Sequence, residues 1–361
     1  MKTYNKVLSI IFLLMFISTG FYIRSYINDT IIPAREALVL ETLQQEIDLI
    51  YSKYAKKKYK DSKQSSIYIL EAYTDRLNDQ TTDELNLVIV KSSLNIMKKE
   101  QDRTNIEKVR LDFENLSDSQ FPNVKVDALI GIAECYMFKE TVSVVDVDNS
   151  INLLEEALSF SQDKELENKN LEKLIAINLI EKYKITKEFS SKSRAIEILI
   201  DRVNKLKESV NIEEYADSLV DLSLAYVKIS FVDQLRTNLR KATEQMELAS
   251  TTLPRKINPN KNARIMRMLG DVYYLRSKMP RLHNEAGPLY IQNVVRFQAI
   301  SKRAYRKAEQ MGVFHDIVPG VQEMRMLDAE NRKRIESVND NDGGGPMRTV
   351  IIDDEKIDDK K

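Results

Sequence analysis

Apolar residues along most of the chain recur at helical spacing. Two stripes with residues three or four positions apart are Leu43, Ile47, Ile50 and Tyr54, and Ile67, Leu70, Tyr73 and Leu77. Such spacing places side chains on one face of an α-helix. Only 9 Gly and 8 Pro occur in 361 residues, so few breaks interrupt these patterns. The sequence therefore predicts an all-α chain, with one or two helix pairs between about Ile31 and Leu116 and further pairs beyond.

A short signature recurs along the predicted helices: a large residue, then a small one, then a tyrosine three positions later. It is complete in Ile132, Ala133 and Tyr136, in Leu222, Ser223 and Tyr226, and in Leu269, Gly270 and Tyr273; Leu179, Ile180 and Tyr183 keep its outer positions. A small residue lets a second helix cross closely over the first. The signature therefore predicts tightly crossed helix pairs.

A second signature follows each first helix, with mostly small, large and small residues at i, i+4 and i+7. It is carried by Ser150, Leu154 and Ala157; by Leu235, Leu239 and Ala242; by Ser301, Tyr305 and Ala308; and more weakly by Ala195, Leu199 and Arg202. These positions share one helical face. The residues predicted to pack the repeats are Ala133, Tyr136, Ala157, Ser223, Tyr226, Ala242, Gly270, Tyr273 and Ala308.

From roughly Asn123 to Gln310 these signatures resemble those of the tetratricopeptide repeat (TPR) family. The resemblance implies a TPR-like α-solenoid of antiparallel helix pairs that acts as an interaction scaffold. The match is divergent, because the signature tyrosines follow at intervals of 47, 43 and 47 residues, against about 34 in the standard repeat, and Trp is absent. An ordinary helical bundle with alanines at tight crossings is the alternative.

The N-terminus carries a charged and then apolar pattern. Lys2 and Lys6 precede the run Val7–Ile23, an order typical of a secretory signal or signal anchor. As a helix the run would span roughly 26 Å, close to a hydrocarbon core of about 30 Å. No A-x-A-like cleavage site follows, so we expect a single-pass membrane anchor at residues 1–27, with the repeats extracytoplasmic by the positive-inside rule. A cleaved signal that releases a secreted chain, or a buried solenoid helix, are the alternatives.

We expect the TPR-like repeat domain to occupy residues 31–337 and a flexible acidic tail to occupy residues 338–361. Within the last repeat, Gly270 and Ser301 lie 31 positions apart, where the family pattern has about 12. The extra residues form either a binding loop or a plain connector that leads into one long helix over Leu289–Ala308.

Net charge is zero, but the charge is unevenly distributed. Arg255 to Ala308 contains 13 basic residues and only Asp271 and Glu285 as acidic ones. The cations whose spacing places them on helix faces of this segment are Lys261, Arg264, Arg267, Arg276, Arg303, Arg306 and Lys307. They are candidate binding residues for an anionic partner, unless they pair with acidic residues of preceding repeats.

Catalytic and metal-binding patterns are absent from the sequence. His283 and His315 are isolated, Cys135 is the single cysteine, and no P-loop or G-x-G-x-x-G occurs. We therefore predict no enzyme activity, no metal site and no cofactor.

The predicted function is that of a membrane-anchored TPR-like scaffold for protein–protein interaction at the extracytoplasmic face of a membrane, with a protein or peptide partner that the basic segment would select as acidic. The alternative is a structural or assembly protein that self-associates as a homo-oligomer, or tethers anionic lipid or cell-wall polymer through its basic last repeat. Nucleic acid is disfavoured, because basic and aromatic residues do not interleave as a base-stacking surface requires.

Overall fold

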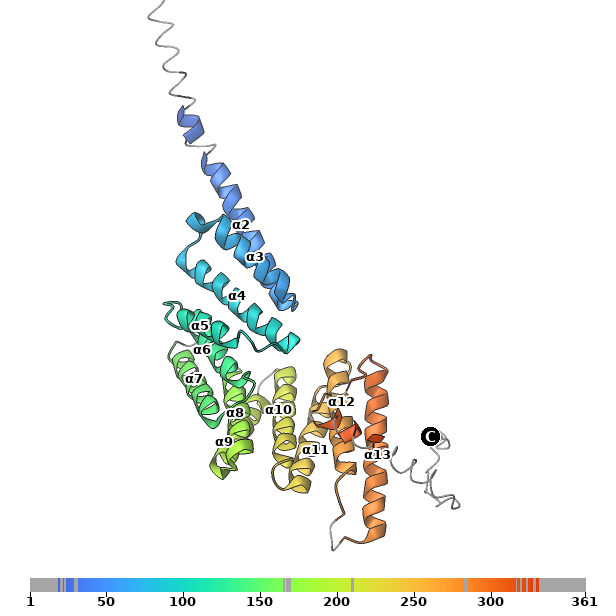
Figure 1. The fold of residues 1–361 in the computed structure, drawn as a ribbon. Helices are drawn as coiled ribbons and strands as arrows, with labels where there is room; N and C mark the ends of the chain where they lie inside the picture. The colour runs from blue at the N-terminus through green and yellow to red at the C-terminus, as the bar shows by residue number, and fades with distance from the viewer. Residues whose placement is uncertain are drawn as a thin grey trace, which may run out of the picture. The chain divides into compact units, whose positions relative to one another are not determined.

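The computed structural model describes residues 19, 22, 24–28, 32–164, 166, 170–208, 211–281, 285–315, 317–318, 320–322, 324–326 and 329–330. These residues are almost entirely helical and include no strand (Figure 1), which confirms the predicted all-α class. The chain divides into two compact units, Met1–Leu171 and Glu172–Lys361.

The predicted anchor and tail fall largely outside this description. Of the apolar run 7–23, only Thr19 and Tyr22 are described, and the tail 338–361 is not described at all. Among the helices of the described part, none is both long and apolar enough to cross a membrane. The anchor at residues 1–27 therefore stays a prediction.

The first unit is a succession of helices in which each packs against its neighbour in the chain. They are α2 (Ile32–Ala55), α3 (Tyr59–Ala72), the 3-10 turn η2 (Thr74–Arg76), α4 (Asp79–Glu100), α5 (Ile106–Ser117), α6 (Pro122–Met137) and α7 (Val144–Asp163). The helix α4 also touches α6. Packing of each helix on the next is the arrangement that a stack of helical hairpins requires.

Two apolar cores hold this unit together, and α4 contributes to both. Leu85 lies in the first core with Ile50 of α2 and Ile69 of α3. Leu94 lies in the second core with Phe113 of α5. Because α4 packs its residues into both cores, it links successive hairpins of this unit.

A close approach of two helices in this unit depends on a glycine. A Cβ atom built on Gly131 of α6 would overlap the ring of Phe113, which is itself fully buried. The separation is far inside van der Waals contact, so a residue larger than glycine would have to displace the ring. The sequence signature identified Ala133, two positions later, and missed Gly131.

The helix α7 begins with a capping box. The Ser143 hydroxyl oxygen accepts a hydrogen bond from the Asp146 backbone N–H at 3.2 Å, and the Asp146 carboxylate accepts one from the Ser143 backbone N–H at 3.0 Å. Lys139 Nζ donates to the same carboxylate at 2.7 Å. These contacts satisfy backbone groups that a helix start otherwise leaves open.

We expect Asp146 to make the stability of the chain depend on pH. Burial disfavours its carboxylate form, but hydrogen bonds from Lys139 and Ser143 outweigh that effect and lower its pKa from 3.8 to about 2. Because the folded-state pKa is depressed, the stabilisation is fully present above the unfolded-state pKa and is lost as the pH falls through about 2. The difference in pKa corresponds to about 2 kcal/mol.

Urea unfolding of the wild-type chain and of Asp146→Asn, at about pH 6 and about pH 2, checks this expectation. The difference in unfolding free energy between the two chains should shrink by more than half at the lower pH. A difference that stays constant would show that Asp146 does not titrate with a depressed pKa.

The second unit contains α8 (Leu171–Thr186), α9 (Phe189–Lys207), α10 (Ile212–Ser230), α11 (Leu235–Thr252), α12 (Pro259–Ser277) and α13 (Gly287–Glu309). The predicted long helix Leu289–Ala308 lies wholly within α13, so the extra residues of the last repeat include a long helical extension after the connector. The predicted long helix is therefore confirmed, whereas a binding role for the connector between α12 and α13 is not tested by it.

Three of the helix pairs share one contact at their crossing. In each pair a serine hydroxyl on one helix donates to a backbone carbonyl on the other: Ser150 to Ala133 at 2.9 Å, Ser223 to Ala242 at 2.7 Å and Ser301 to Gly270 at 2.8 Å. All three serines are buried. A hydroxyl reaches a carbonyl across a crossing only where small residues bring the two backbones together. The pairs α6–α7, α10–α11 and α12–α13 are thus built alike.

The remaining packing positions follow the sequence signatures. Ala157, Ala242 and Ala308 have no exposed surface, and Tyr226 and Tyr273 are 7% and 5% exposed. Tyr136 differs in being only partly buried, and its ring lies beneath the cationic groups of Arg110 and Lys139. The signature residues thus lie where successive helices meet.

Candidate functional site

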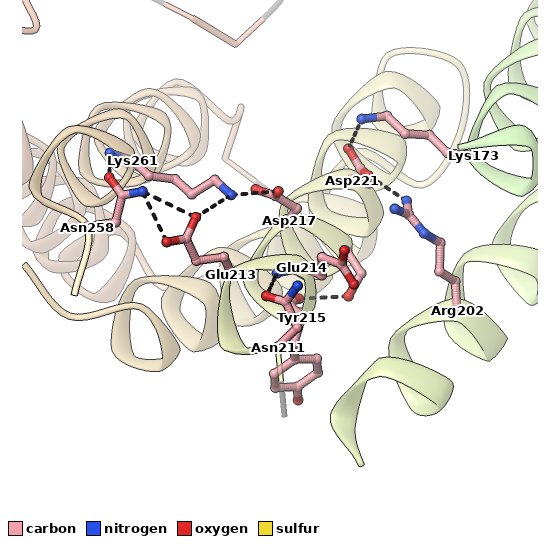
Figure 2. A network of polar contacts seen from close by, with 11 residues as sticks. Lys173, Arg202, Asn211, Glu213, Glu214, Tyr215, Asp217, Asp221, Asn258 and Lys261 are labelled. Atoms are coloured by element: carbon pink, nitrogen blue, oxygen red, sulfur yellow. Dashed lines mark hydrogen bonds and ion pairs between the residues drawn. The ribbon is translucent and has the colours of Figure 1, made fainter. Parts of the chain in front are cut away.

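The candidate cation Lys261 is held by acidic residues of the preceding helix pair. Its Nζ lies 2.8 Å from Asp217 Oδ2 and 3.2 Å from Glu213 Oε2 (Figure 2). Asn258, which caps α12, also donates to Glu213 at 3.2 Å. Hydrogen bonds from Asn258 and Lys261 hold the pKa of Glu213 below its ordinary value. Lys261 therefore links α12 to α10.

The acidic residues of α10 form a stripe that faces several helices. Glu213, Asp217 and Asp221 are spaced four apart, so they share one face of the helix. Asp221 accepts from Lys173 of α8 at 2.7 Å and from Arg202 of α9 at 2.9 Å, as Figure 2 shows. This stripe explains how a cation of the basic segment is neutralised by a preceding repeat.

The candidate cation Arg267 lies inside the last helix pair. Its side chain is 6% exposed, and its Nη1 lies 3.3 Å from Glu309 Oε1. The guanidinium stacks over the ring of Tyr305 at 4.2 Å from the ring centre. Arg267 therefore serves packing between α12 and α13, because a side chain so enclosed presents little surface to a partner.

The acidic residue Asp271 completes this buried cluster. It has no exposed surface, and it accepts hydrogen bonds from the Tyr305 hydroxyl at 2.9 Å and from the backbone N–H groups of Ile317 and Val318 at 2.8 and 3.0 Å. Arg267 Nε lies 3.9 Å away. Asp271 thus ties the segment after α13 to α12.

Four of the candidate cations remain exposed: Arg264 on α12, and Arg303, Arg306 and Lys307 on α13. Within the described part of the chain these four make no ion pair. The structure does not gather all seven candidates on one surface, since it pairs Lys261 and encloses Arg267. Binding of an anionic partner by the exposed four stays a prediction.

The last candidate, Arg276, lies in a pocket between α11, α12 and α13. The pocket has a volume of about 240 Å³. Its lining residues are Arg236, Thr237 and Arg240 of α11, Arg276 of α12, Met279 and Glu285 of the connector, and Tyr290, Asn293, Val294 and Phe297 of α13. It combines apolar surface with three guanidinium groups and one carboxylate.

Among the residues that the structure describes, Arg276 has no acidic partner in contact. Its guanidinium lies 4.1 Å from the centre of the Phe297 ring. Its Nε is buried and has no hydrogen-bond partner among the described residues. Burial lowers the pKa of Arg276, and only the more distant charges of Tyr273, Glu247 and Glu244 oppose that shift. An acceptor in the pocket would relieve this desolvated cation.

The two other arginines of the pocket, Arg236 and Arg240, differ in their hydrogen bonds and ion pairs. Arg236 donates to Glu285 at 2.9 Å and to the Pro280 carbonyl. Arg240 is exposed and pairs with Glu244 at 3.0 Å, one turn further along α11. Both lie before the basic segment Arg255 to Ala308 that the charge distribution identified, so the sequence analysis did not single them out.

The single cysteine lies in an apolar core. Cys135 has no exposed surface, and burial raises the pKa of its thiol to about 12. A thiol of that pKa is not a nucleophile at neutral pH. Within the residues the structure describes, no group of three His, Cys, Asp or Glu side chains is placed to hold a metal ion.

No protein-family model and no curated protein match the sequence. Solved structures resemble it, among them the following two, each at 13% identity. One holds the "nearly identical TPR-like repeats" of a putative kinesin light chain of Podosopora anserina, with a TM-score of 0.39 and with 58% of this chain and 94% of that chain covered. The other is a Rap protein complexed with competence and sporulation factor, with a TM-score of 0.40 and with 82% of this chain and 87% of that chain covered.

The architecture is identified by the contacts within and between the helical hairpins. Three helix pairs carry the TPR-type small residues at their crossings and the same serine-to-carbonyl contact. Successive helices pack on one another from α2 to α7 in the first unit and from α9 to α13 in the second. The chain therefore has a divergent TPR-like helical-repeat fold, built from stacked hairpins with small residues at their crossings.

Proposed function

We propose that this chain is a scaffold that binds a protein or peptide partner at the extracytoplasmic face of a membrane, to which residues 1–27 anchor it. The observation that carries the scaffold role is the repeated hairpin crossing, because stacked hairpins use their inner faces for packing and leave rows of outer side chains for a partner. The anchor rests on the apolar run Val7–Ile23 and the preceding lysines.

An acidic partner suits the second unit best. Its last helix pair exposes Arg264, Arg303, Arg306 and Lys307. Its pocket holds the guanidinium of Arg276, whose Nε has no hydrogen-bond partner among the described residues. Complementary charge steers association and selects among partners.

Site-specific photocrosslinking in cells tests the scaffold role. A photoreactive amino acid replaces one exposed apolar residue at a time: Leu111 on α5, Ile200 on α9 or Leu248 on α11. We expect at least one position to yield a discrete adduct with another protein, identified by mass spectrometry, while others do not. Absence of adducts from all three positions, or the same unselective smear from each, would contradict a specific partner.

Membrane fractionation tests the anchor. The full-length chain should stay in the membrane pellet after alkaline carbonate washing, whereas a chain that lacks residues 1–27 should be released. Protease added to intact cells with a permeabilised outer barrier should digest the repeats if they are extracytoplasmic. Mass determination of the N-terminus distinguishes an anchor from a cleaved signal, and carbonate release of a chain with intact Met1 would contradict the anchor.

A second candidate is tethering of an anionic surface by the exposed cations Arg264, Arg303, Arg306 and Lys307. They make no ion pair among the described residues, so they are open to lipid headgroups or an anionic polymer. Co-sedimentation with phosphatidylglycerol vesicles, but not with phosphatidylcholine vesicles, is expected. Replacing all four by glutamine should abolish it, and equal sedimentation of this variant would contradict the candidate.

A further inference from the structure

The pocket between α11, α12 and α13 is suited to a single residue of a partner. Its volume of about 240 Å³ is below the roughly 300–1,000 Å³ that is typical of small-molecule and cofactor sites. It is lined by three helices and by Met279 and Glu285 of the connector, and the Tyr290 hydroxyl donates to the Met279 carbonyl at 3.0 Å. The contact holds Met279 near the first turns of α13.

One part of the pocket is apolar. Phe297 and Val294 of α13 and Met279 of the connector line it, and Met279 is only 8% exposed. The Phe297 ring also packs against Tyr273 with ring centres 5.9 Å apart. An aliphatic group placed here would leave water for a preformed apolar surface.

The other part is lined by guanidinium groups that suit an anion. Arg276 is partly buried against Phe297 and its Nε has no hydrogen-bond partner among the described residues. Arg240 is paired only with Glu244, and both side chains are at least half exposed. An exposed pair of this kind contributes little, so Arg240 can turn to a ligand at low cost, and it lines the pocket from the opposite helix.

The charge balance of the pocket favours a carboxylate over a phosphate. Glu285 is already occupied by Arg236, which leaves Arg240 and Arg276 for one singly charged group. A phosphate would leave the apolar part unfilled and would place a second negative charge near Glu285. A carboxylate attached to an aliphatic body matches both parts.

We propose that this pocket binds one residue of a protein or peptide partner, with its aliphatic body against Phe297 and Met279 and its carboxylate between Arg276 and Arg240. This inference rests on the proposed scaffold function, since it names the chemical group of the partner that the scaffold recognises. Two sources supply such a group: the C-terminal residue of a chain, or a glutamate side chain within it.

Methyl NMR of the full-length protein tests the proposal with defined small probes. The protein is labelled at the methionine methyl groups, and the Met279 signal is assigned with Met279→Leu. N-acetyl-leucine represents a C-terminal residue, N-acetyl-leucine amide is its uncharged match, and N-acetyl-glutamic acid α-amide represents an internal glutamate. Met97 of the first unit serves as the internal reference that should not move.

The expected result is a saturable shift of the Met279 signal with N-acetyl-leucine and none with its amide. A response to the glutamate probe alone would assign the recognised group to a side chain, and a response to the leucine probe alone to a C-terminus; both support the proposal. The proposal would be overturned if the Met279 signal did not shift with any probe. It would also be overturned if N-acetyl-leucine amide shifted the signal as much as N-acetyl-leucine does, or if inorganic phosphate bound equally well.

Variants connect the signal to the arginines. Arg276→Gln should weaken binding of the carboxylate probe about tenfold or more, since it removes a charge-assisted hydrogen bond. Arg303→Gln, which removes an exposed cation of α13 outside the pocket, should leave the affinity unchanged. If Arg276→Gln fails to fold, Arg240→Gln tests the same site at an exposed position. If Arg303→Gln weakened binding of the carboxylate probe as much as Arg276→Gln does, the effect would come from the overall positive charge, and the proposal would be overturned.

The outcome is separable from that of the scaffold. Crosslinked partners from Leu248 with an unresponsive Met279 would leave the scaffold role intact and refute the pocket. A responsive Met279 without any crosslinked partner would support the pocket's chemistry and contradict the scaffold.

Discussion

Replacing Asp271 by alanine is expected to lower the free energy of unfolding by about 3–5 kcal/mol, the range for removing one partner of a buried charge pair. The substitution would leave the Tyr305 hydroxyl and the N–H groups of Ile317 and Val318 without their acceptor. It would also remove a carboxylate that lies beside the enclosed guanidinium of Arg267. A buried donor that loses its acceptor keeps the free-energy cost of its desolvation without the hydrogen bond that offset it.

Urea unfolding followed by circular dichroism measures this loss, and hydrogen exchange locates it. The amides of Ile317 and Val318 should exchange faster in Asp271→Ala, because the segment after α13 loses its attachment to α12. Asp217→Ala is the matched control: Asp217 is an acidic residue of α10 with a side chain that is 46% exposed, so its loss should cost less than about 1 kcal/mol. Equal losses in both variants would refute the central role of Asp271.

Replacing Gly270 by alanine is expected to cost about 1–3 kcal/mol, the range for overpacking a closely packed interior. A Cβ atom at this position would lie 2.6 Å from the Tyr305 ring and 3.3 Å from the Ser301 carbonyl oxygen. The ring cannot move freely, since its hydroxyl is bonded to Asp271 and Arg267 stacks on its face. Thermal unfolding of the variant measures the loss.

Two further variants separate this clash from the general cost of changing a glycine. Gly287→Ala at the start of α13 should have little effect, because its nearest neighbouring atom would lie 3.6 Å away. Combining Gly270→Ala with Tyr305→Ala should cost less than the sum of the two single changes, because the second change removes the ring that the new methyl group meets. Strict additivity would show that the clash is not with Tyr305.

The helical class and the repeat signatures could be predicted because they depend on local spacing. Ala133, Ser223 and Gly270 lie at crossings because a small residue on the packed face of a helix is recognisable in the sequence itself. Gly131 was missed, because nothing near it in the chain indicates that Phe113 packs against it from the preceding helix.

The acidic partner of each cation could not be predicted from local spacing. Lys261 meets Asp217, 44 positions earlier, and Arg267 meets Glu309, 42 positions later. The same long-range pairing occurs in the first unit, where Lys91 meets Asp127 at 2.9 Å. Composition counts cations, but the distance to an opposite charge depends on how helices stack, and the energy of a charge depends on that distance and on its burial.

The sequence by itself determined that the chain is helical, that its helices pair, where several pairs cross, and that a basic segment lies in the last repeat. These properties depend on residues within a few turns of one another. Only the tertiary structure showed that Lys261 and Arg267 pair with acidic residues of other helices and that Asp271 is a buried acceptor of several hydrogen bonds. It also showed that Arg276 shares a pocket with Arg240 and Phe297. Those roles arise from contacts between helices, where burial removes water and makes each polar group depend on a partner distant in the chain.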